Sequence, residues 1–219
     1  MAKLLTDKNK VAFCTAALGV IINCDSNTQS FFQAHEEDVV SFDLHPERRI
    51  AATGQMAMKG KSKFIDIFVW DIETKKILNQ INGFHLRAVR LLKFTQDGKY
   101  LLSIGEDDDN SMAVYDWQSN RLIASAKVDK TNVLGIDSNS PSEFMTVGSR
   151  HVKVWKLSGC QLKGSQISWP QSAKQEPVIC CAGLDGKGFA IGTAKGNLML
   201  VRGSIEKPQE VHKGKIYVM

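Results

Sequence analysis

The sequence predicts an all-β fold assembled from repeated four-stranded sheets. Helical periodicity is nearly absent, and short apolar runs alternate with turn residues along all 219 residues. Similar strands recur with spacings of 45, 40 and 46 residues, at Trp70-Asp71, Tyr115-Asp116, Trp155 and Val201. A period of about 40–45 residues, with about four strands in each copy, is typical of a WD40-type β-propeller.

The repeat predicts four full blades with a partial blade at each end. We expect residues 1–10 to form an N-terminal tail, 11–34 a three-stranded partial blade, and 212–219 the start of a further blade. Each blade of a propeller contacts only its neighbours, so we expect an arc of a larger ring whose apolar ends are covered by another chain or copy. The full blades are expected at 35–84, 85–128, 129–170 and 171–211.

Strands can be assigned most clearly in the first full blade. The inner strand is expected at 38–46, the second at 49–55, the third at 65–72 and the outer at 75–81. The inner strands are nearly continuous apolar runs, which predicts that neighbouring blades cover them on both faces. Gly and Asn residues, as in Asp97-Gly98, are typical of the hairpin turns that join such strands.

Composition and charge limit the class of protein. The hydrophobic fraction of 43% and the charged fraction of 23% are ordinary for a globular protein. The net charge of +5 fits an acidic partner surface and equally a plain solvated face. No apolar run approaches the ~18–20 residues that span a bilayer, and the polar start is unlike a secretory signal. We therefore expect an intracellular chain with neither a membrane nor a nucleic acid as its partner.

No residue pattern indicates catalysis, a cofactor or a metal. The five cysteines contain no CxxC pair, so we expect buried thiols rather than a disulfide framework or a zinc site. The acidic run "GEDDDNS" at 105–111 lacks the spacing of a calcium loop and predicts a hairpin turn. The run "GTAKGN" at 192–197 lacks the order of a phosphate-binding loop and predicts another turn. We expect that the protein is not an enzyme.

Longer stretches of the chain resemble one family. The segments "AHEEDVVSFDLHPERRIAATGQ", "FVWD", "GFHLRAVRLLKF" and "EDDDNSMAVYDWQ" are similar, in order and spacing, to the echinoderm microtubule-associated protein-like family. They resemble the first propeller of its tandem-propeller domain. The similarity is strong over 34–118 and weaker afterwards, where Trp155 has no following Asp and Val201 replaces the aromatic residue.

The resemblance implies structural roles for the repeated polar residues. WD repeats carry a hydrogen-bonded set of a His, a second-strand Ser or Thr, a turn Asp and a Trp. The resemblance places His35, Thr53 and Trp70 in this set, while Phe64 stands at the position of the turn Asp. In the next blade it places His85, Asp109 and Tyr115, and the remaining repeat positions are Asp71, Asp116 and Trp155.

One loop is a candidate for partner binding. The insertion "MAMKGKSKF" at 56–64 carries Lys59, Lys61 and Lys63 and is longer than a hairpin turn requires. Loops on a rigid scaffold often carry binding residues, although a plain solvated loop is the alternative. Arg48 and Arg49 occupy the preceding turn, which lies on the opposite face of a propeller.

The resemblance also implies a function. It indicates a non-catalytic, microtubule-associated scaffold with tubulin as its partner, located in the cytoplasm, on the cytoskeleton or in a cilium. A general WD40 scaffold in another assembly, such as a ubiquitin-ligase or trafficking complex, is the alternative, because fold does not fix function.

Overall fold

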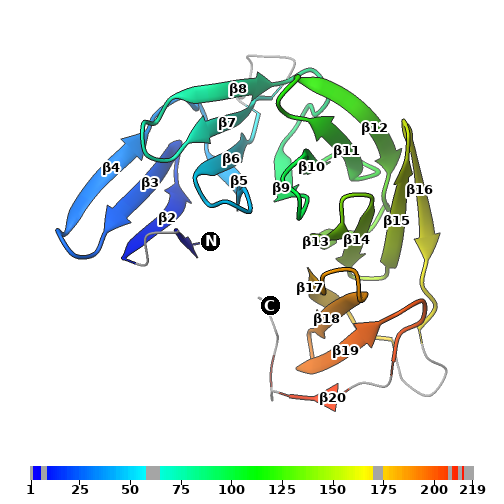
Figure 1. The fold of residues 1–219 in the computed structure, drawn as a ribbon. Coiled ribbons are helices and arrows are strands. Elements are labelled where there is room, and N and C mark those ends of the chain that lie inside the picture. The colour runs from blue at the N-terminus through cyan, green and yellow to red at the C-terminus, as the bar shows by residue number, and fades with distance from the viewer. Residues whose placement is uncertain are drawn as a thin grey trace. The chain divides into compact units, whose positions relative to one another are not determined.

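The computed structural model describes residues 2–5, 9–57, 65–169, 175–206, 209–211 and 214. Within them, the regular elements are β strands in five four-stranded antiparallel sheets, each of which follows the order of the chain (Figure 1). None of the described residues belongs to a helix that is long and apolar enough to cross a membrane. The all-β propeller architecture predicted from the repeat is therefore confirmed.

The first two sheets contain the segment in which the repeat is clearest. Their strands are β1 (Ala2–Leu4), β2 (Lys10–Thr15), β3 (Leu18–Asn23) and β4 (Thr28–Phe32), followed by β5 (Val39–Leu44), β6 (Ile50–Gln55), β7 (Ile67–Asp71) and β8 (Ile77–Ile81).

The third, fourth and fifth sheets repeat the same plan. Their strands are β9 (Val89–Phe94), β10 (Tyr100–Gly105), β11 (Ser111–Asp116) and β12 (Arg121–Lys127), then β13 (Val133–Ser140), β14 (Glu143–Gly148), β15 (Val152–Ser158) and β16 (Gln161–Gln166), and finally β17 (Val178–Gly183), β18 (Phe189–Thr193), β19 (Asn197–Val201) and β20 (Gln209–Glu210).

The first sheet has one strand more than the sequence predicted. Residues 1–10 were expected as a tail, but β1 lies within them and pairs with β2 in the register Ala2↔Phe13 and Leu4↔Val11. The first sheet therefore has its own inner strand, and the expectation of a three-stranded partial blade is wrong. A three-residue strand beside a polar segment leaves little periodic signal in the sequence. The further strand expected at 212–219 falls almost entirely outside the described residues.

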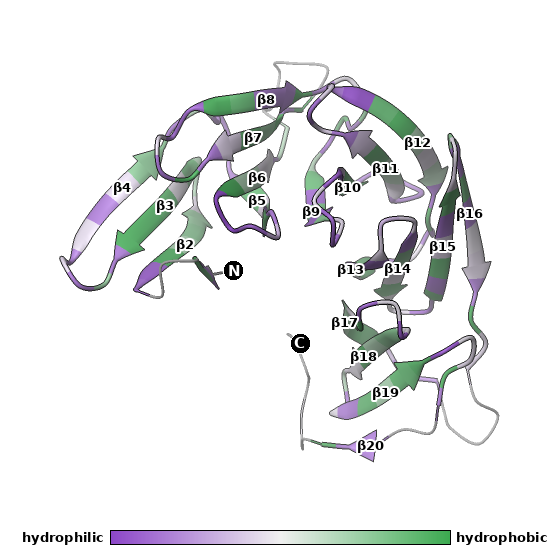
Figure 2. Cartoon of the chain, viewed as in Figure 1, coloured by the Kyte–Doolittle hydropathy of each residue, from purple (hydrophilic) through white to green (hydrophobic). Residues whose placement is uncertain are grey.

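The second strand of each sheet from the second to the fifth is the most buried. In β6, β10 and β14, every residue after the first is buried, and all five residues of β18 are buried. The inner strands, such as β9, alternate between buried and partly exposed residues instead. The prediction that inner strands are the fully covered ones is thus wrong, because they carry partly exposed polar residues such as Arg90 and Lys93. Figure 2 shows that the outer strands β8 and β12 carry both hydrophobic and hydrophilic segments.

Contacts divide the chain into two compact units, and the division falls within the third sheet. The first unit has one cluster that joins the first and second sheets around Phe32 and Trp70. A second cluster in that unit joins the second and third sheets around Val69 and Phe94. The second unit has a cluster around Met145 and Phe189. The first unit comprises Met1–Phe94, Gly98–Asp107 and Ala113–Leu122, and the second comprises Thr95–Asp97, Asp108–Met112 and Ile123–Met219.

Aspartates connect consecutive inner strands inside each unit, a buried one in the first unit and a half-buried one in the second. Asp43 on β5 forms an ion pair with Lys3 on β1 and accepts a hydrogen bond from the N–H of Phe94 on β9 at 2.8 Å. In the second unit, Asp137 on β13 accepts a hydrogen bond from the N–H of Gly183 on β17 at 3.3 Å. Each aspartate is the fifth residue of its strand, and each N–H belongs to the sixth residue of the next inner strand. The repeat therefore reuses one polar connection between sheets.

The cysteines are free thiols, but most of them are not buried. Cys180 is buried, Cys14 and Cys181 are half-buried, and Cys24 and Cys160 are exposed in turns. The expectation of buried thiols is wrong for the two exposed residues, because hairpin turns leave their side chains in solvent.

Candidate binding surface

The polar set of the second sheet is formed around Thr53. Thr53 Oγ1 lies 2.7 Å from His35 Nε2 and accepts a hydrogen bond from Trp70 Nε1 at 3.2 Å. Gln55 Oε1 lies 2.8 Å from His35 Nδ1, so it occupies the place that WD repeats give to an acid. Phe64, at that place in the sequence, lies outside the described residues. The sequence comparison missed Gln55 because it compared turn residues, whereas Gln55 is on β6, two residues after Thr53.

These side chains are packed between the first and second sheets. The Trp70 ring stacks on Phe32 with a centroid separation of 4.3 Å and an interplanar angle of 2°. Burial lowers the pKa of His35, although the hydrogen bond to Gln55 opposes this. A neutral His35 with its proton on Nδ1 donates to Gln55 and accepts from the Thr53 hydroxyl, so neither ring nitrogen is available to a substrate. The set is architectural.

The equivalent set in the third sheet is incomplete. His85 Nε2 lies 2.6 Å from Ser103 Oγ, and Tyr115 also hydrogen-bonds to Ser103. Among the described residues, His85 Nδ1 has no hydrogen-bond partner, so Asp109 does not fill the place predicted for it. Asp109 instead pairs with Lys127, at 2.7 Å. Ser103 was missed, although it follows His85 by the same 18 residues that separate Thr53 from His35.

The acids that follow the aromatic residues form turns. Asp71 Oδ1 accepts hydrogen bonds from the N–H groups of Glu73 at 3.0 Å and Thr74 at 2.7 Å. The Thr74 bond is the main reason that the pKa of Asp71 is lowered. Asp116 accepts the N–H of Ser119 at 3.2 Å in the equivalent turn. Both aspartates therefore stabilise the turn between the third and outer strands, and neither faces a ligand site.

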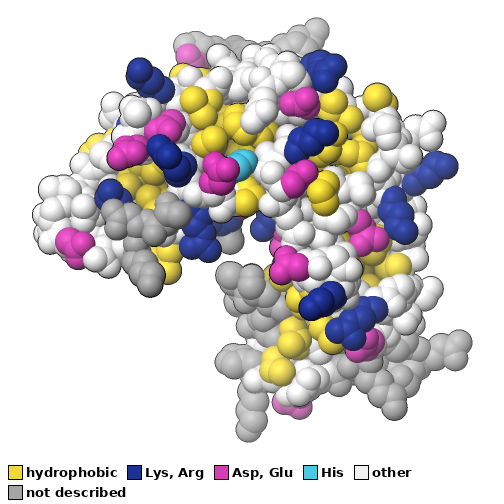
Figure 3. All heavy atoms as spheres, in the orientation of Figure 1, with side chains coloured by type: hydrophobic (Ala, Val, Ile, Leu, Met, Phe, Trp, Pro, Cys, Tyr) yellow, Lys and Arg dark blue, Asp and Glu magenta, His cyan; other side chains and the backbone are white. Residues whose placement is uncertain are grey.

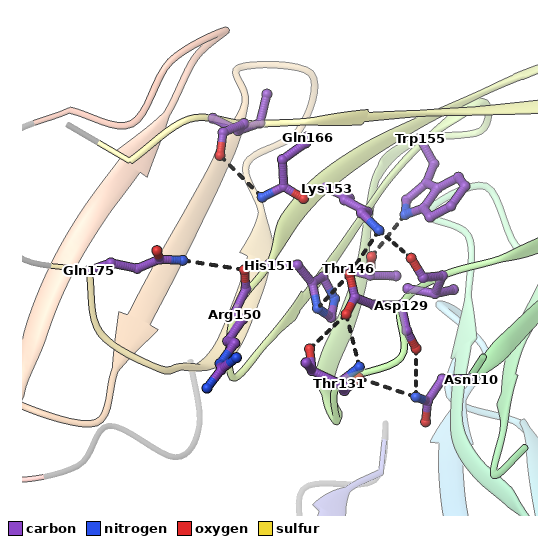
Figure 4. A network of polar contacts seen from close by, with 12 residues as sticks. Asn110, Asp129, Thr131, Thr146, Arg150, His151, Lys153, Trp155, Gln166 and Gln175 are labelled. Carbon is purple, nitrogen blue, oxygen red and sulfur yellow. Dashed lines mark hydrogen bonds and ion pairs between the residues drawn. The ribbon is translucent and has the colours of Figure 1, made fainter. Parts of the chain in front are cut away.

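The fourth sheet rearranges the same polar positions (Figure 4). Trp155 Nε1 donates to Thr146 Oγ1 at 2.8 Å, which reproduces the Trp70–Thr53 bond. Asp129 precedes β13 by four residues, the offset at which histidines precede β5 and β9. His151 lies in the turn after β14, and its Nδ1 is 4.0 Å from Asp129 Oδ2. In this sheet an acid therefore stands at the offset that His35 and His85 occupy in the preceding two sheets.

Lys153 determines the charge of this cluster. Its Nζ lies 3.0 Å from Asp129 Oδ2. Burial disfavours the Asp129 carboxylate, but hydrogen bonds from Thr131 and Lys153 outweigh it and lower the pKa to about 2. Burial lowers the pKa of His151 to about 4, against the attraction of Asp129, and Lys153 adds to the lowering. At neutral pH the cluster is an Asp–Lys ion pair beside a neutral histidine. A paired charge and a neutral ring can be accommodated inside the fold, so we interpret the cluster as structural.

The concave surface with the most suggestive chemistry lies in the first unit. A groove with a volume of about 470 Å³ is bordered by turns of the first and second sheets. The turns after β5 and β7 contribute to it together, because alternate hairpin turns of a meander lie at the same end of the sheet. We call it the basic groove, and it is lined by Leu5, Lys10, Ile21, Asn23, Thr28, Gln29, Ser30, Arg48, Arg49, Ile72, Glu73 and Lys75.

The charges of the basic groove are mostly positive. Its cations are Lys10, Arg48, Arg49 and Lys75, and Glu73 is the one acid among the described lining residues. Figure 3 shows Lys and Arg side chains over the first two sheets, with Asp and Glu side chains beside them. The predicted binding lysines Lys59, Lys61 and Lys63 lie outside the described residues, so we do not assign them to the groove. No group of three or more His, Cys, Asp or Glu side chains suited to a metal occurs among the described residues.

Comparison with known proteins identifies relatives over nearly the whole chain. Echinoderm microtubule-associated protein-like 1 of Rattus norvegicus is 26% identical over 227 aligned residues, which cover 98% of this chain and 28% of the relative. Cilia- and flagella-associated protein 52 of Chlamydomonas reinhardtii is 31% identical over 133 residues, covering 60% of this chain and 21% of that protein. The chain therefore spans less than a third of the length of these relatives.

A solved structure and a family model complete the comparison. The β-propeller domain of Cps50 (Swd1) from Myceliophteria thermophila superposes with a TM-score of 0.67 at 14% identity, over 82% of this chain and 59% of that one. This likeness concerns the fold alone. The model of the echinoderm microtubule-associated protein first β-propeller matches residues 28–219. The match covers most of the repeat described above, and the chain belongs to that family of first propellers.

Proposed function

We propose that this chain is a non-catalytic, microtubule-associated scaffold that binds tubulin through its propeller surface. The observation that carries the proposal is the family match over residues 28–219. The buried polar sets support the non-catalytic part, because their histidines are neutral and engaged in packing. The name of the ciliary relative supports a cytoskeletal or ciliary location. The basic groove supports an acidic partner surface, since opposite charges attract across an interface.

Co-sedimentation with assembled microtubules tests this proposal. We expect the purified chain to pellet with microtubules and to be released as salt rises from about 0.1 M to 1 M, because the Debye length falls from about 10 Å to about 3 Å. If all of the chain stayed in the supernatant at every protein concentration, direct binding would be contradicted. Recovery of ligase or coat components from a pull-down, without tubulin, would favour the general scaffold instead.

The covering of the terminal sheets by another chain or copy stays a prediction. Sedimentation velocity over a range of concentrations tests whether the cover is a second copy of this chain. A mass that rises with concentration would support self-association, and a monomer at every concentration would leave a different protein as the expected cover.

A further inference from the structure

The basic groove combines an apolar floor with a polar rim. Leu5, Ile21 and Ile72 line it and are buried, so its base is hydrophobic. Thr28 and Gln29 line it from the start of β4, which is the outer edge strand of the first sheet. An edge strand can pair with an extended segment through main-chain groups. The groove therefore offers an extended chain both apolar contact and hydrogen-bond partners.

Among the described residues, Arg48 and Lys75 form no ion pair, and Arg49 forms only a weak one. Arg49 Nη2 lies 3.9 Å from Glu73 Oε2, and both side chains are mostly exposed, so this pair is weak. The Arg48 guanidinium forms no hydrogen bond or ion pair with any other described residue. Lys75 Nζ donates to the carbonyl oxygens of Ile72 at 2.5 Å and Glu73 at 3.2 Å, which fixes its charge at the groove.

Two of these cations occupy backbone positions that disfavour them. Arg48 has a φ of +55° and Lys75 a φ of +61°, which is the left-handed region that suits Gly and Asn. In the third sheet, the position equivalent to Arg48 is filled by Gly98, with a φ of +71°. Lys75 is the fourth residue after its third strand, and Asn27 and Asn120 fill this position in the first and third sheets.

Arg48 therefore differs from its counterpart Gly98 in the third sheet, and Lys75 differs from its Asn counterparts in the first and third sheets. A long cation in a left-handed turn destabilises the fold slightly relative to Gly or Asn, and strained positions of this kind often occur at functional sites. Burial lowers the pKa of Lys75, and the neighbouring positive charge of Lys10 adds to this lowering, although Asp71 and Glu73 oppose it. An anion placed between these two lysines would therefore be stabilised by both.

We propose that the basic groove binds an extended, carboxylate-rich peptide segment of a partner protein. The guanidinium groups of Arg48 and Arg49 suit carboxylates, which they can hold through paired N–H donors. The main chain of the segment would follow the start of β4, over the apolar floor. None of the described lining residues is aromatic, and they therefore offer no stacking surface of the kind that single-stranded nucleic acids use. This inference deepens the proposed function and rests on it for the source of the segment.

Fluorescence polarisation with a labelled peptide of about ten residues, rich in Glu, tests the groove directly. A matched peptide with Gln in place of Glu is the probe control. The test variant is Arg48→Asn with Lys75→Asn, because Asn already fills one of the equivalent turns. The control variant is Lys187→Asn with Lys195→Asn, which removes the same charge from exposed turns of the fifth sheet.

We expect the groove variant to bind the Glu peptide about tenfold more weakly, since two exposed charge contacts are lost. The control variant should bind like the wild type, and the Gln peptide should bind poorly to all three. The groove variant should keep its thermal midpoint, because Asn is tolerated in left-handed turns. Equal losses in both variants, or an oligonucleotide of equal charge that binds the groove as well as the peptide, would overturn the inference.

Microtubule co-sedimentation of the same variants separates the two proposals. If the wild type binds the Glu peptide but does not pellet with microtubules, the proposed function is wrong and the groove inference stands. If the wild type pellets but the Glu peptide does not bind, the groove inference is wrong and the proposed function stands.

Discussion

Replacing Trp70 with Ala should destabilise the first unit strongly. Trp70 is 1% exposed, stacks on Phe32 and donates to Thr53, so it contacts both of the sheets that form its core. Removal of a buried Trp costs about 3–5 kcal/mol, and the lost aromatic pair adds about 0.5–1.5 kcal/mol. Thr53 keeps its bond to His35, so no buried hydroxyl is left without a partner. The expected loss is about 4–6 kcal/mol.

Trp155→Ala is the matched control for this prediction. Trp155 is buried and donates to Thr146 in the same way, but no described aromatic ring stacks on it. Its removal should therefore cost about 3–5 kcal/mol, without the contribution of a ring pair. A loss for Trp70 that is clearly larger than the loss for Trp155 would support the stacking argument.

Urea unfolding followed by far-UV circular dichroism measures both variants. Because the chain has two compact units, hydrogen exchange should accompany it, to show in which sheets protection is lost. Domains are typically stable by about 5–15 kcal/mol, so Trp70→Ala should leave the first unit close to unfolding at 25 °C. A variant that keeps its unfolding midpoint but loses its partner would refute the structural role given to Trp70.

Three further perturbations test other parts of the structure. Stability should fall as the pH drops from about 6.5 to about 4, because buried His85 and His151 have pKa values lowered from 6.5 to about 4 and the unfolded chain then binds more protons. At about pH 5 the loss should approach 2 kcal/mol for each histidine, measured as a shift in urea midpoint, and an unchanged midpoint between pH 7 and 5 would contradict it. Gly54→Ala would place a Cβ 2.6 Å from Ser41 Oγ and 2.7 Å from Val89 Cβ, so it should destabilise the fold by about 1–3 kcal/mol. A thermal midpoint equal to that of the wild type would show that the second and third sheets can separate there. Replacement of Lys59, Lys61 and Lys63 by Ser should leave the fold intact and reduce both the affinity for an acidic partner and its salt dependence. Equal affinity and an equal salt slope would show that this loop does not bind.

The sequence predicted the repeat because its signals are local. The apolar runs and turn residues of each sheet are close together in the sequence, so their spacing reveals the strands. The recurrence of Trp70, Tyr115 and Trp155 then reveals that the sheets are copies. The family resemblance placed His35, Thr53 and Trp70 in one set, and in the structure His35 and Trp70 both hydrogen-bond to Thr53 Oγ1. Strand β1 was missed because three residues carry no measurable period, and its pairing with β2 is visible only in the structure.

The basic groove could not be predicted in the same way. Its residues come from β2, β3, β4 and the segment after β1 in the first sheet and from two turns of the next sheet, and their approach depends on how the two sheets pack. The sequence did show Arg48 and Arg49 in a turn. Lys75 lies in the turn after β7, which is at the same end of the sheet as the turn after β5, and this shared position would have joined Lys75 to the two arginines. The signal that was available is the replacement of Gly or Asn at two left-handed positions. A comparison of each turn with its copies in the other sheets would have revealed it.

The same comparison of copies explains why the buried polar sets vary without loss of the fold. The second, third and fourth sheets each carry a Ser or Thr as the fourth residue of the second strand, and the Trp or Tyr of the third strand hydrogen-bonds to it. The second and third sheets pair this residue with His35 and His85, whereas in the fourth sheet Asp129, His151 and Lys153 form a charged cluster of their own. What is retained is the aromatic anchor, whose burial supplies most of the stabilisation. What varies is the polar group that precedes the inner strand, which only has to be neutral or paired with a charge. A group that is free to vary in this way is maintained for packing, and binding is expected where a residue departs from the repeat at a cost to folding, as at Arg48.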